Sequence, residues 1–419
     1  MKKKKIVTTP FDRYRMPPKQ NLFFVPLIWL VCLFMTCGSR LKIRRTRMKG
    51  LKPPYLVLAT HQAFMDFYVA PLALFPHRAN YISELEGFEN FGEWIYRRIG
   101  CLGTRKFVDD LALIRNIKRV VERKGVLVLF PEARYANAGT SSRLLYTVGK
   151  LAKMLGVPVV VLNMHGNYLQ SPIWNLKKRK GVRLEAEITQ LFTKEELAAA
   201  SLPQIMNAFR EHLQYDEYAW QLQKDMRISF PNRAEGLELV LYKCPDCGRE
   251  FRMKAVGAEL CCPDCEGRWH MTELGRLERI SGANADAGFT HIPDWYEWER
   301  EQAAREIDRD EYALAVRVKI ESLPNAVNFI DLGEGFLRHG RDGFALTFKD
   351  CGEDTEQTLV VAPAKAPSVH TEYDYRGKGP CITLSTLDNT YFLFPMEDGF
   401  NVTKIQFAAE YLHDKATKR

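Results

Sequence analysis

Blocks of apolar residues separated by polar loops mark the first part of the chain, and three short blocks predict buried strands. They are residues 53–60 (PPYLVLAT), 125–130 (GVLVLF) and 157–163 (VPVVVLN). Short apolar runs bounded by proline or glycine are typical of strands covered on both faces. Residues 141–156 lie between the last two runs and predict a helix that ends at Gly156, from apolar residues at helical spacing: Leu144, Leu145, Val148, Leu151, Ala152 and Leu155. Strand, helix and strand in this order indicate an α/β crossover.

The polar pattern changes beyond residue 190. Residues 193–214 predict helix, and Asp294 with Glu297 suggests a capping box for a helix over residues 295–307. Short alternating segments separated by Gly, Asp and Asn fill residues 325–400, and residues 402–415 predict a closing helix. This pattern indicates a small antiparallel β domain, and strands followed by one helix would suit a pleckstrin-homology-like barrel.

Charge is concentrated at one end of the chain. The 419 residues, 46% hydrophobic and 26% charged, fit two or three globular domains. Residues 1–49 hold thirteen Lys or Arg and one acid, a net +12, which leaves −3 for the other 370 residues from the total of +9. A short basic segment argues against a nucleic-acid-binding protein and predicts attraction to anionic lipid headgroups.

Within the basic segment, residues 20–39 carry no charged side chain. About 20 residues are needed to cross a bilayer, so a crossing helix is one interpretation. Pro26 interrupts the run, and Lys or Arg lies on both flanks. Because basic flanks keep both ends on the cytoplasmic face, we favour an interfacial or re-entrant anchor.

Four stretches in order resemble the glycerolipid (lysophosphatidate-type) acyltransferase family. HQAFMD, residues 61–66, matches its H-x4-D motif, and GCLGTRKF, residues 100–107, stands in place of a block with a basic residue. FPEAR, residues 130–134, resembles its F-P-E-G-x-R block, and VPVVVL, residues 157–162, resembles its V-P-V-x-P-V strand. The resemblance covers about residues 20–215 and implies an α/β acyltransferase domain that acts on lipids.

The resemblance gives His61 and Asp66 catalytic roles, and their chemistry suits acyl transfer. An imidazole can take the proton of an attacking alcohol near neutral pH, and a carboxylate on its other nitrogen fixes the tautomer. A spacing of five residues predicts that His61 lies just before a helix and Asp66 in its first turn. Backbone amides at this helix start are candidate oxyanion donors. His165 could reach the site, although a structural histidine is the better interpretation.

Substrate binding is expected at the FPEAR block and at the second block. Arg134 could contact a phosphate through two hydrogen bonds, and Glu132 could bind a glycerol hydroxyl or orient the arginine. The usual glycine is Ala133 here, and the arginine follows the glutamate by two residues instead of three. Arg105 or Lys106 could therefore hold the phosphate instead.

Two C-x2-C pairs, Cys244 with Cys247 and Cys262 with Cys265, are separated by fourteen residues. This spacing predicts a structural zinc ion held by four thiolates, with Cys261 as an alternative to Cys262. Zinc in place of disulfides implies a reducing compartment. Residues 243–268 hold five basic and five acidic residues, which argues against a ribbon that binds nucleic acid.

Together these features predict a membrane-associated acyltransferase that converts 1-acyl-glycerol-3-phosphate into phosphatidate, with acyl-CoA or acyl carrier protein as donor. Another lysophospholipid, glycerol 3-phosphate, or a non-catalytic zinc scaffold remains an alternative. We expect a monotopic or single-anchor protein on the cytoplasmic face of a bacterial-type membrane, with a protein partner for the C-terminal region. The expected parts are an anchor (1–50), an acyltransferase domain (51–230), a zinc ribbon (240–270), a helical linker (290–322) and a β domain with a terminal helix (323–419).

Overall fold

The computed structural model describes residues 7–282, 288–349, 355–397 and 400–417. These residues form two compact units. The N-terminal unit consists of Asp12–Thr104 and Asp110–Ile228. The C-terminal unit consists of the described residues of Met1–Phe11, Arg105–Asp109 and Ser229–Arg419. A five-residue segment that follows the strand ending at Thr104 therefore belongs to the C-terminal unit.

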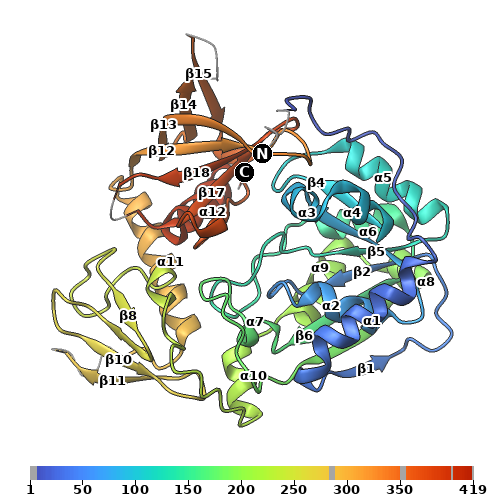
Figure 1. Ribbon diagram of the computed structural model, residues 1–419, viewed down its shortest axis with the longest axis horizontal. Coiled ribbons are helices and arrows are strands. Elements are labelled where there is room, and N and C mark those ends of the chain that lie inside the picture. The colour runs from blue at the N-terminus through green and yellow to red at the C-terminus, as the bar shows by residue number, and fades with distance from the viewer. Residues whose placement is uncertain (1–6, 283–287, 350–354, 398–399, 418–419) are drawn as a thin grey trace, which may run out of the picture. The chain divides into compact units, whose positions relative to one another are not determined.

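A seven-stranded sheet forms the centre of the N-terminal unit (Figure 1). In spatial order its strands are β1 (Lys42–Thr46), β7 (Glu185–Phe192), β6 (Val159–His165), β2 (Tyr55–Ala59), β5 (Val126–Leu129), β3 (Ala79–Glu84) and β4 (Cys101–Thr104). Neighbouring strands are parallel except for β6 and β7, so β1 and β7 run opposite to the other five. The three strands predicted from apolar runs are β2, β5 and β6.

Helices cover both faces of this sheet. They are α1 (Phe24–Thr36), α2 (Asp66–Leu74), α3 (Leu85–Phe91), α4 (Glu93–Arg98), α5 (Leu111–Glu122), α6 (Thr147–Leu155), α7 (Asn167–Gln170), α8 (Lys194–Ala199), α9 (Leu202–Leu213) and α10 (Glu217–Gln223). Leu56 and Leu58 of β2 share one core cluster with residues of α5, α6, α8 and α9. Since all of β2 is buried and side chains alternate along a strand, its other residues face the opposite side. There α2 contacts β6 and β7, and α1 contacts α2. The predicted crossover is confirmed, with α6 between β5 and β6.

The uncharged run of residues 20–39 contains helix α1, which is 13 residues long. Within the described part of the chain, no helix combines the length and apolar character needed to span a bilayer. The expected interruption at Pro26 is wrong. Pro26 lies in the first turn of α1, where a missing N–H leaves no helical hydrogen bond unmade.

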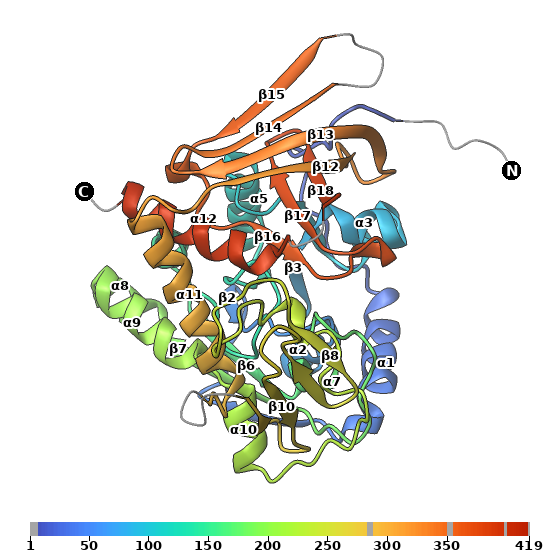
Figure 2. The ribbon, with the colours of Figure 1, turned by 90° about the vertical axis from the view of Figure 1, so that its left-hand side faces the viewer.

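The C-terminal unit contains two antiparallel sheets (Figure 2). The smaller one has the order β11 (Leu277–Ser281), β10 (Arg268–Met271), β9 (Glu259–Cys261) and β8 (Lys254–Val256). The larger one has the order β15 (Glu356–Val361), β14 (Gly343–Lys349), β13 (Ile330–Gly340), β12 (Leu314–Ser322), β18 (Thr390–Pro395), β17 (Cys381–Ser385) and β16 (His370–Glu372). Helix α11 (Ile292–Asp308) contacts α12 (Val402–Thr417), which also contacts β16.

Two expectations about this unit are wrong in detail. Strand β12 lies inside the segment expected to be a helical linker and pairs with both β13 and β18 in the middle of the sheet. The capping box fails because α11 begins at Ile292, which places Asp294 in its first turn. The N-cap is His291, and Pro293 near the start favours this earlier beginning.

Candidate active site and metal site

The loop after strand β2 brings His61 and Asp66 together. The Nδ1 atom of His61 lies 3.0 Å from Oδ2 of Asp66, which is the first residue of α2. The side chains are only 8% and 0% exposed, so solvent does not compete for this hydrogen bond. This is the arrangement expected from the spacing of five residues.

Asp66 is held by three further donors. Its Oδ2 accepts the backbone N–H groups of Gln62 (2.6 Å) and Ala63 (3.1 Å), and its Oδ1 accepts Nδ2 of Asn167 (2.6 Å). Together with His61, these donors fix the orientation of the carboxylate. Glu132 and Asp66 accept the backbone N–H groups of residues 61–63, so these three are engaged within the protein, and oxyanion donors among the other amides at the helix start stay a prediction.

Aromatic rings enclose the imidazole of His61. It stacks on Phe130 with ring centroids 4.3 Å apart, and the ring of Tyr135 lies 4.5 Å away. Phe67 approaches edge-on at 5.9 Å. Because Nδ1 faces Asp66, Nε2 is the nitrogen that can accept a proton from a bound hydroxyl.

Glu132 follows strand β5, next to β2, and supports the His61 loop. Its Oε1 accepts the backbone N–H of His61 (3.0 Å), while its Oε2 accepts the backbone N–H of Ser142 (2.6 Å) and the hydroxyl of Tyr215 (3.2 Å). Burial raises the pKa of Glu132 to about 7, although these three donors oppose the shift. The geometry makes Glu132 a link between two loops, and its contact with a substrate hydroxyl stays a prediction.

Arg134 is 4% exposed, and its Nε donates to the hydroxyl of Ser142 at 3.4 Å. Between it and Glu132, Ala133 has a φ of +56°. This left-handed conformation has a free-energy cost of about 1–2 kcal/mol for a residue with a side chain and no such cost for glycine. The loop therefore keeps a backbone shape that the usual glycine of this motif would adopt without strain.

Arg105 and Lys106 lie in the segment that belongs to the C-terminal unit. The guanidinium of Arg105 donates to the carbonyls of Leu387 (3.1 Å), Pro324 (2.7 Å) and Asp388 (3.0 Å). Lys106 Nζ lies 3.0 Å from Nδ1 of His370. Both contacts bind this segment to the larger β sheet, and a role for either residue in phosphate binding stays a prediction.

A cavity of about 450 Å³ adjoins Glu132 and holds two arginines that sequence reasoning missed. It is lined by Glu132, Ser141, Ser142, Arg143, Leu144, Tyr146, Arg210, Leu213 and Gln214. Gly139, at the start of this loop, has a φ of +77°, and an added Cβ would lie 2.8 Å from the ring of Tyr168. Residues 139–143 (GTSSR) combine a glycine that the turn requires with three hydroxyl side chains and an arginine, and this pattern could have indicated Arg143. Arg210 lies on α9, and no local pattern links it to the site.

His165, at the end of β6, has a buried carboxylate partner. Its Nδ1 lies 2.9 Å from Oε1 of Glu217, whose other oxygen accepts the N–H of Gly166 at 2.6 Å. The imidazole stacks on Trp220 with ring centroids 5.2 Å apart. These contacts support the structural interpretation of His165.

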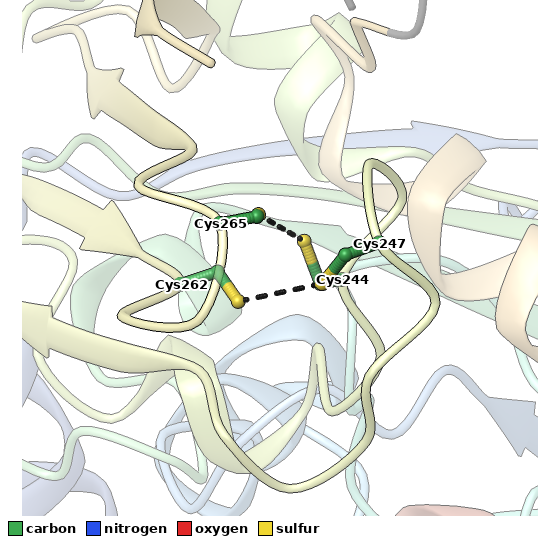
Figure 3. A group of neighbouring side chains, drawn as sticks. All are labelled: Cys244, Cys247, Cys262 and Cys265. Atoms are coloured by element: carbon green, nitrogen blue, oxygen red, sulfur yellow. Dashed lines mark hydrogen bonds between the residues drawn. The ribbon is translucent and has the colours of Figure 1, made fainter. Parts of the chain in front are cut away.

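The four cysteines of the two C-x2-C pairs form one cluster in the C-terminal unit (Figure 3). Sγ of Cys244 lies 3.6 Å from Sγ of Cys265, and Sγ of Cys247 lies 3.8 Å from Sγ of Cys262. A disulfide would need about 2.05 Å. A tetrahedron of zinc–sulfur bonds of about 2.3 Å requires sulfurs about 3.8 Å apart, so the donor set and spacing fit a zinc ion. Cys261 is outside the cluster, which favours Cys262 over its alternative.

The titration of Glu132 leads to a first prediction. Its pKa is higher in the folded protein than the ordinary value of 4.5, so its contribution to stability is present at low pH and is lost as pH rises to about 7. We expect the unfolding free energy of the N-terminal unit to fall by about 2–3 kcal/mol between pH 4.5 and pH 8, relative to a Glu132→Gln variant. Urea unfolding of both proteins over this range measures the difference. A difference that is constant or grows with pH would refute the assignment.

Comparison with known proteins matches the sequence to one family model and to six chains of solved structures. The acyltransferase family model matches residues 40–165. Among solved structures, a similar one is the crystal structure of the 1-acyl-sn-glycerophosphate (LPA) acyltransferase PlsC from Thermotoga maritima, with 16% identity and a TM-score of 0.38. The match covers 46% of this chain and 77% of that one. No curated protein is significantly similar to the sequence.

Proposed function

We propose that the protein transfers a fatty acyl group from a thioester to 1-acyl-glycerol-3-phosphate, giving phosphatidate, and the match of residues 40–165 to the acyltransferase family model supports this reaction. The observation that carries the proposal is the His61–Asp66 hydrogen bond of 3.0 Å at the carboxyl end of β2. Ligands of α/β folds bind at this edge of the sheet. The acyl donor is acyl-CoA or acyl carrier protein.

In the proposed reaction, Nε2 of His61 removes the proton of the acceptor hydroxyl while the oxygen attacks the thioester carbonyl carbon. The tetrahedral intermediate then loses the thiolate as the carbon–sulfur bond breaks, and the imidazolium returns the proton to the sulfur. Asp66 keeps the remaining proton on Nδ1 and stabilises the imidazolium that forms. No covalent acyl-enzyme is needed, since the acceptor oxygen itself attacks.

The cavity beside Glu132 is our proposed site for the acceptor phosphate. Arg143 and Arg210 line it, and a guanidinium can donate two parallel hydrogen bonds to a phosphate. Because Glu132 binds both the His61 backbone and the Ser142 backbone, a phosphate at this loop would be linked to the catalytic loop through one side chain. Arg134, which donates to Ser142, would support the loop from the protein interior.

The reaction is tested with purified full-length protein, lysophosphatidate in neutral detergent micelles and a labelled acyl-CoA. We expect label in phosphatidate. If label appears instead in the product of another lysophospholipid or of glycerol 3-phosphate, the proposed acceptor is wrong and the proposed acyl transfer is kept. A repeat with acyl carrier protein distinguishes the donors. Absence of product with every donor and acceptor would overturn the proposal in favour of a non-catalytic scaffold.

The acceptor site gives the second prediction. We expect Arg143→Ala and Arg210→Ala each to raise the KM for lysophosphatidate by about tenfold to a hundredfold, because each removes a charged hydrogen bond of about 1.5–3 kcal/mol. The KM for acyl-CoA should change little. Steady-state kinetics with one substrate varied at a time provides the measurement.

Arg227→Ala is a matched control, since Arg227 is an exposed arginine of the same unit that pairs only with neighbouring Asp225 among its described ion pairs. An equal rise in KM for this control would show a general effect of surface charge. A rise confined to acyl-CoA would assign the cavity to the phosphates of the donor instead.

We also propose that the protein works on the cytoplasmic face of a membrane, where a lysophospholipid is found. The basic and apolar character of residues 1–50 supports this location. The zinc ribbon and the β domain are proposed as accessory parts that bind a protein partner.

A further inference from the structure

A second cavity in the N-terminal unit, of about 800 Å³, lies between residues 15–23 and helix α4. Its charged lining is strongly unbalanced, with one acid, Glu93, against five basic residues: Arg15, Lys19, Arg78, Arg97 and Arg98. Arg15 pairs with Glu93 at 2.8 Å. The lining of this open cavity therefore carries a net charge of +4.

Two of the basic side chains, Arg97 and Arg98, have defined contacts at the cavity. Arg97 donates to the carbonyl of Met16 at 2.8 Å, and the guanidinium of Arg98 lies 3.8 Å from the ring of Trp94. The N–H of Asn21 donates to the carbonyl of Arg98 at 3.0 Å, which joins the segment to α4. Burial and then the like charge of Arg15 lower the pKa of Arg97, so an anion in the cavity would relieve this repulsion.

This cavity lies at the amino ends of the sheet strands, whereas His61 lies at their carboxyl ends. Arg78 precedes β3, and Arg98 comes shortly before β4, whereas His61 and Glu132 follow the carboxyl ends of β2 and β5. These four strands run in the same direction. The cavity is therefore separate from the proposed acceptor site.

An exposed apolar surface extends from the cavity. On α1 and the residues before it, the exposed side chains are Leu22, Phe23, Leu27, Leu30, Val31, Leu33 and Phe34. Phe24 of α1 contacts Trp94 at the cavity, with ring centroids 5.8 Å apart, and Trp29 contacts exposed Phe75 at the end of α2 at 4.6 Å. Phe91, Trp94 and Ile95 are also 40–58% exposed. Monomeric soluble proteins rarely expose contiguous apolar patches of this kind.

We propose that the cavity binds the phosphate of an anionic phospholipid headgroup in a bilayer, while α1 and the exposed residues of α3 and α4 enter the acyl-chain region. Charge complementarity and the position of Trp94 argue for a lipid surface over another protein. A membrane interface presents phosphates beside hydrocarbon and favours Trp with Arg at that boundary. The proposal goes beyond the proposed reaction, because the headgroup bound here is not the substrate.

Binding of the full-length protein to sedimented vesicles tests this site. We expect strong binding to phosphatidylcholine vesicles that contain phosphatidylglycerol and weak binding to phosphatidylcholine alone. Lys19→Glu with Arg98→Glu should lower binding to the anionic vesicles by about tenfold or more. Lys19 is exposed, so a Lys19→Glu single variant gives a smaller loss without disturbing the fold.

The matched control is Lys194→Glu with Arg227→Glu, which changes the net charge by the same amount at exposed positions of this unit that do not line the cavity. Equal losses in the two double variants would overturn the proposal, as would equal binding of wild type to both vesicles. Acyl transfer in neutral micelles should be unchanged in Lys19→Glu with Arg98→Glu. Failure of the headgroup site is thus distinguishable from failure of the proposed reaction.

Discussion

Replacement of His61 by alanine is expected to lower kcat for acyl transfer by about three to four orders of magnitude. The variant loses the group that we propose takes the acceptor proton, and the Asp66 carboxylate loses the imidazolium it would stabilise. We propose no role for that nitrogen in substrate binding, so KM values should change little. Since His61 is nearly buried among Phe130 and Tyr135, the variant also leaves a small cavity.

The measurement is single-turnover transfer of a labelled acyl group to lysophosphatidate, together with thermal unfolding to show that the variant is folded. His212→Ala is the matched control, because His212 is exposed on α9 and its Nδ1 contacts only a carbonyl of its own helix among its described hydrogen bonds. We expect the control to keep wild-type activity. A His61→Ala protein with undiminished turnover would remove His61 from the mechanism.

Replacement of Cys247 by serine is expected to abolish zinc binding and the fold of residues 243–281. Structural zinc contributes about 10–16 kcal/mol in small zinc-binding peptides, more than a four-stranded sheet of such short strands can supply alone. We expect one zinc ion per chain in wild type and none in the variant, by metal analysis of reduced protein. Hydrogen exchange should become fast across β8 to β11.

Cys261→Ser gives the matched control for the metal site. Cys261 is the immediate neighbour of Cys262 but lies outside the cluster, so this variant should keep its zinc and its slow exchange. Equal loss of metal in both variants would mean that the ligand set is wrong. If wild-type protein purified under reducing conditions contains no bound zinc, the metal site as a whole is refuted.

The sequence could predict those features that are formed by residues close together in the chain. Continuous apolar runs identified β2, β5 and β6, and the spacing of His61 and Asp66 predicted their geometry around a helix start. The cysteine pairs likewise carry their own geometry, since each C-x2-C turn presents two sulfurs to one centre. Strands β1, β3, β4 and β7 were missed, because polar residues or glycine interrupt each of them and they form no continuous apolar run.

Other features depend on contacts between segments far apart in the chain. Arg105 lies within a motif-like block, but its partners include the carbonyls of Pro324 and Asp388. Glu132 was expected to bind a glycerol hydroxyl or to orient Arg134, and the sequence did not indicate that its two oxygens also meet donors from residues 61, 142 and 215. Arg210 enters the cavity from a helix with no motif. Sequence periodicity carries no information on such pairings, which are fixed only when the sheet is assembled.

Some basic residues of the N-terminal segment lie on the edge strand β1, where they affect pairing between copies of the protein. This strand forms one edge of the seven-stranded sheet, and four of its five residues are exposed, among them Lys42, Arg44 and Arg45. An open edge can pair with the same edge of another copy, and positive charges on it disfavour such pairing. Proteins that gather on a membrane reach high local concentrations, where edge-to-edge pairing would lead to aggregates. The basic residues for which we propose attraction to lipid would thus also keep neighbouring copies apart.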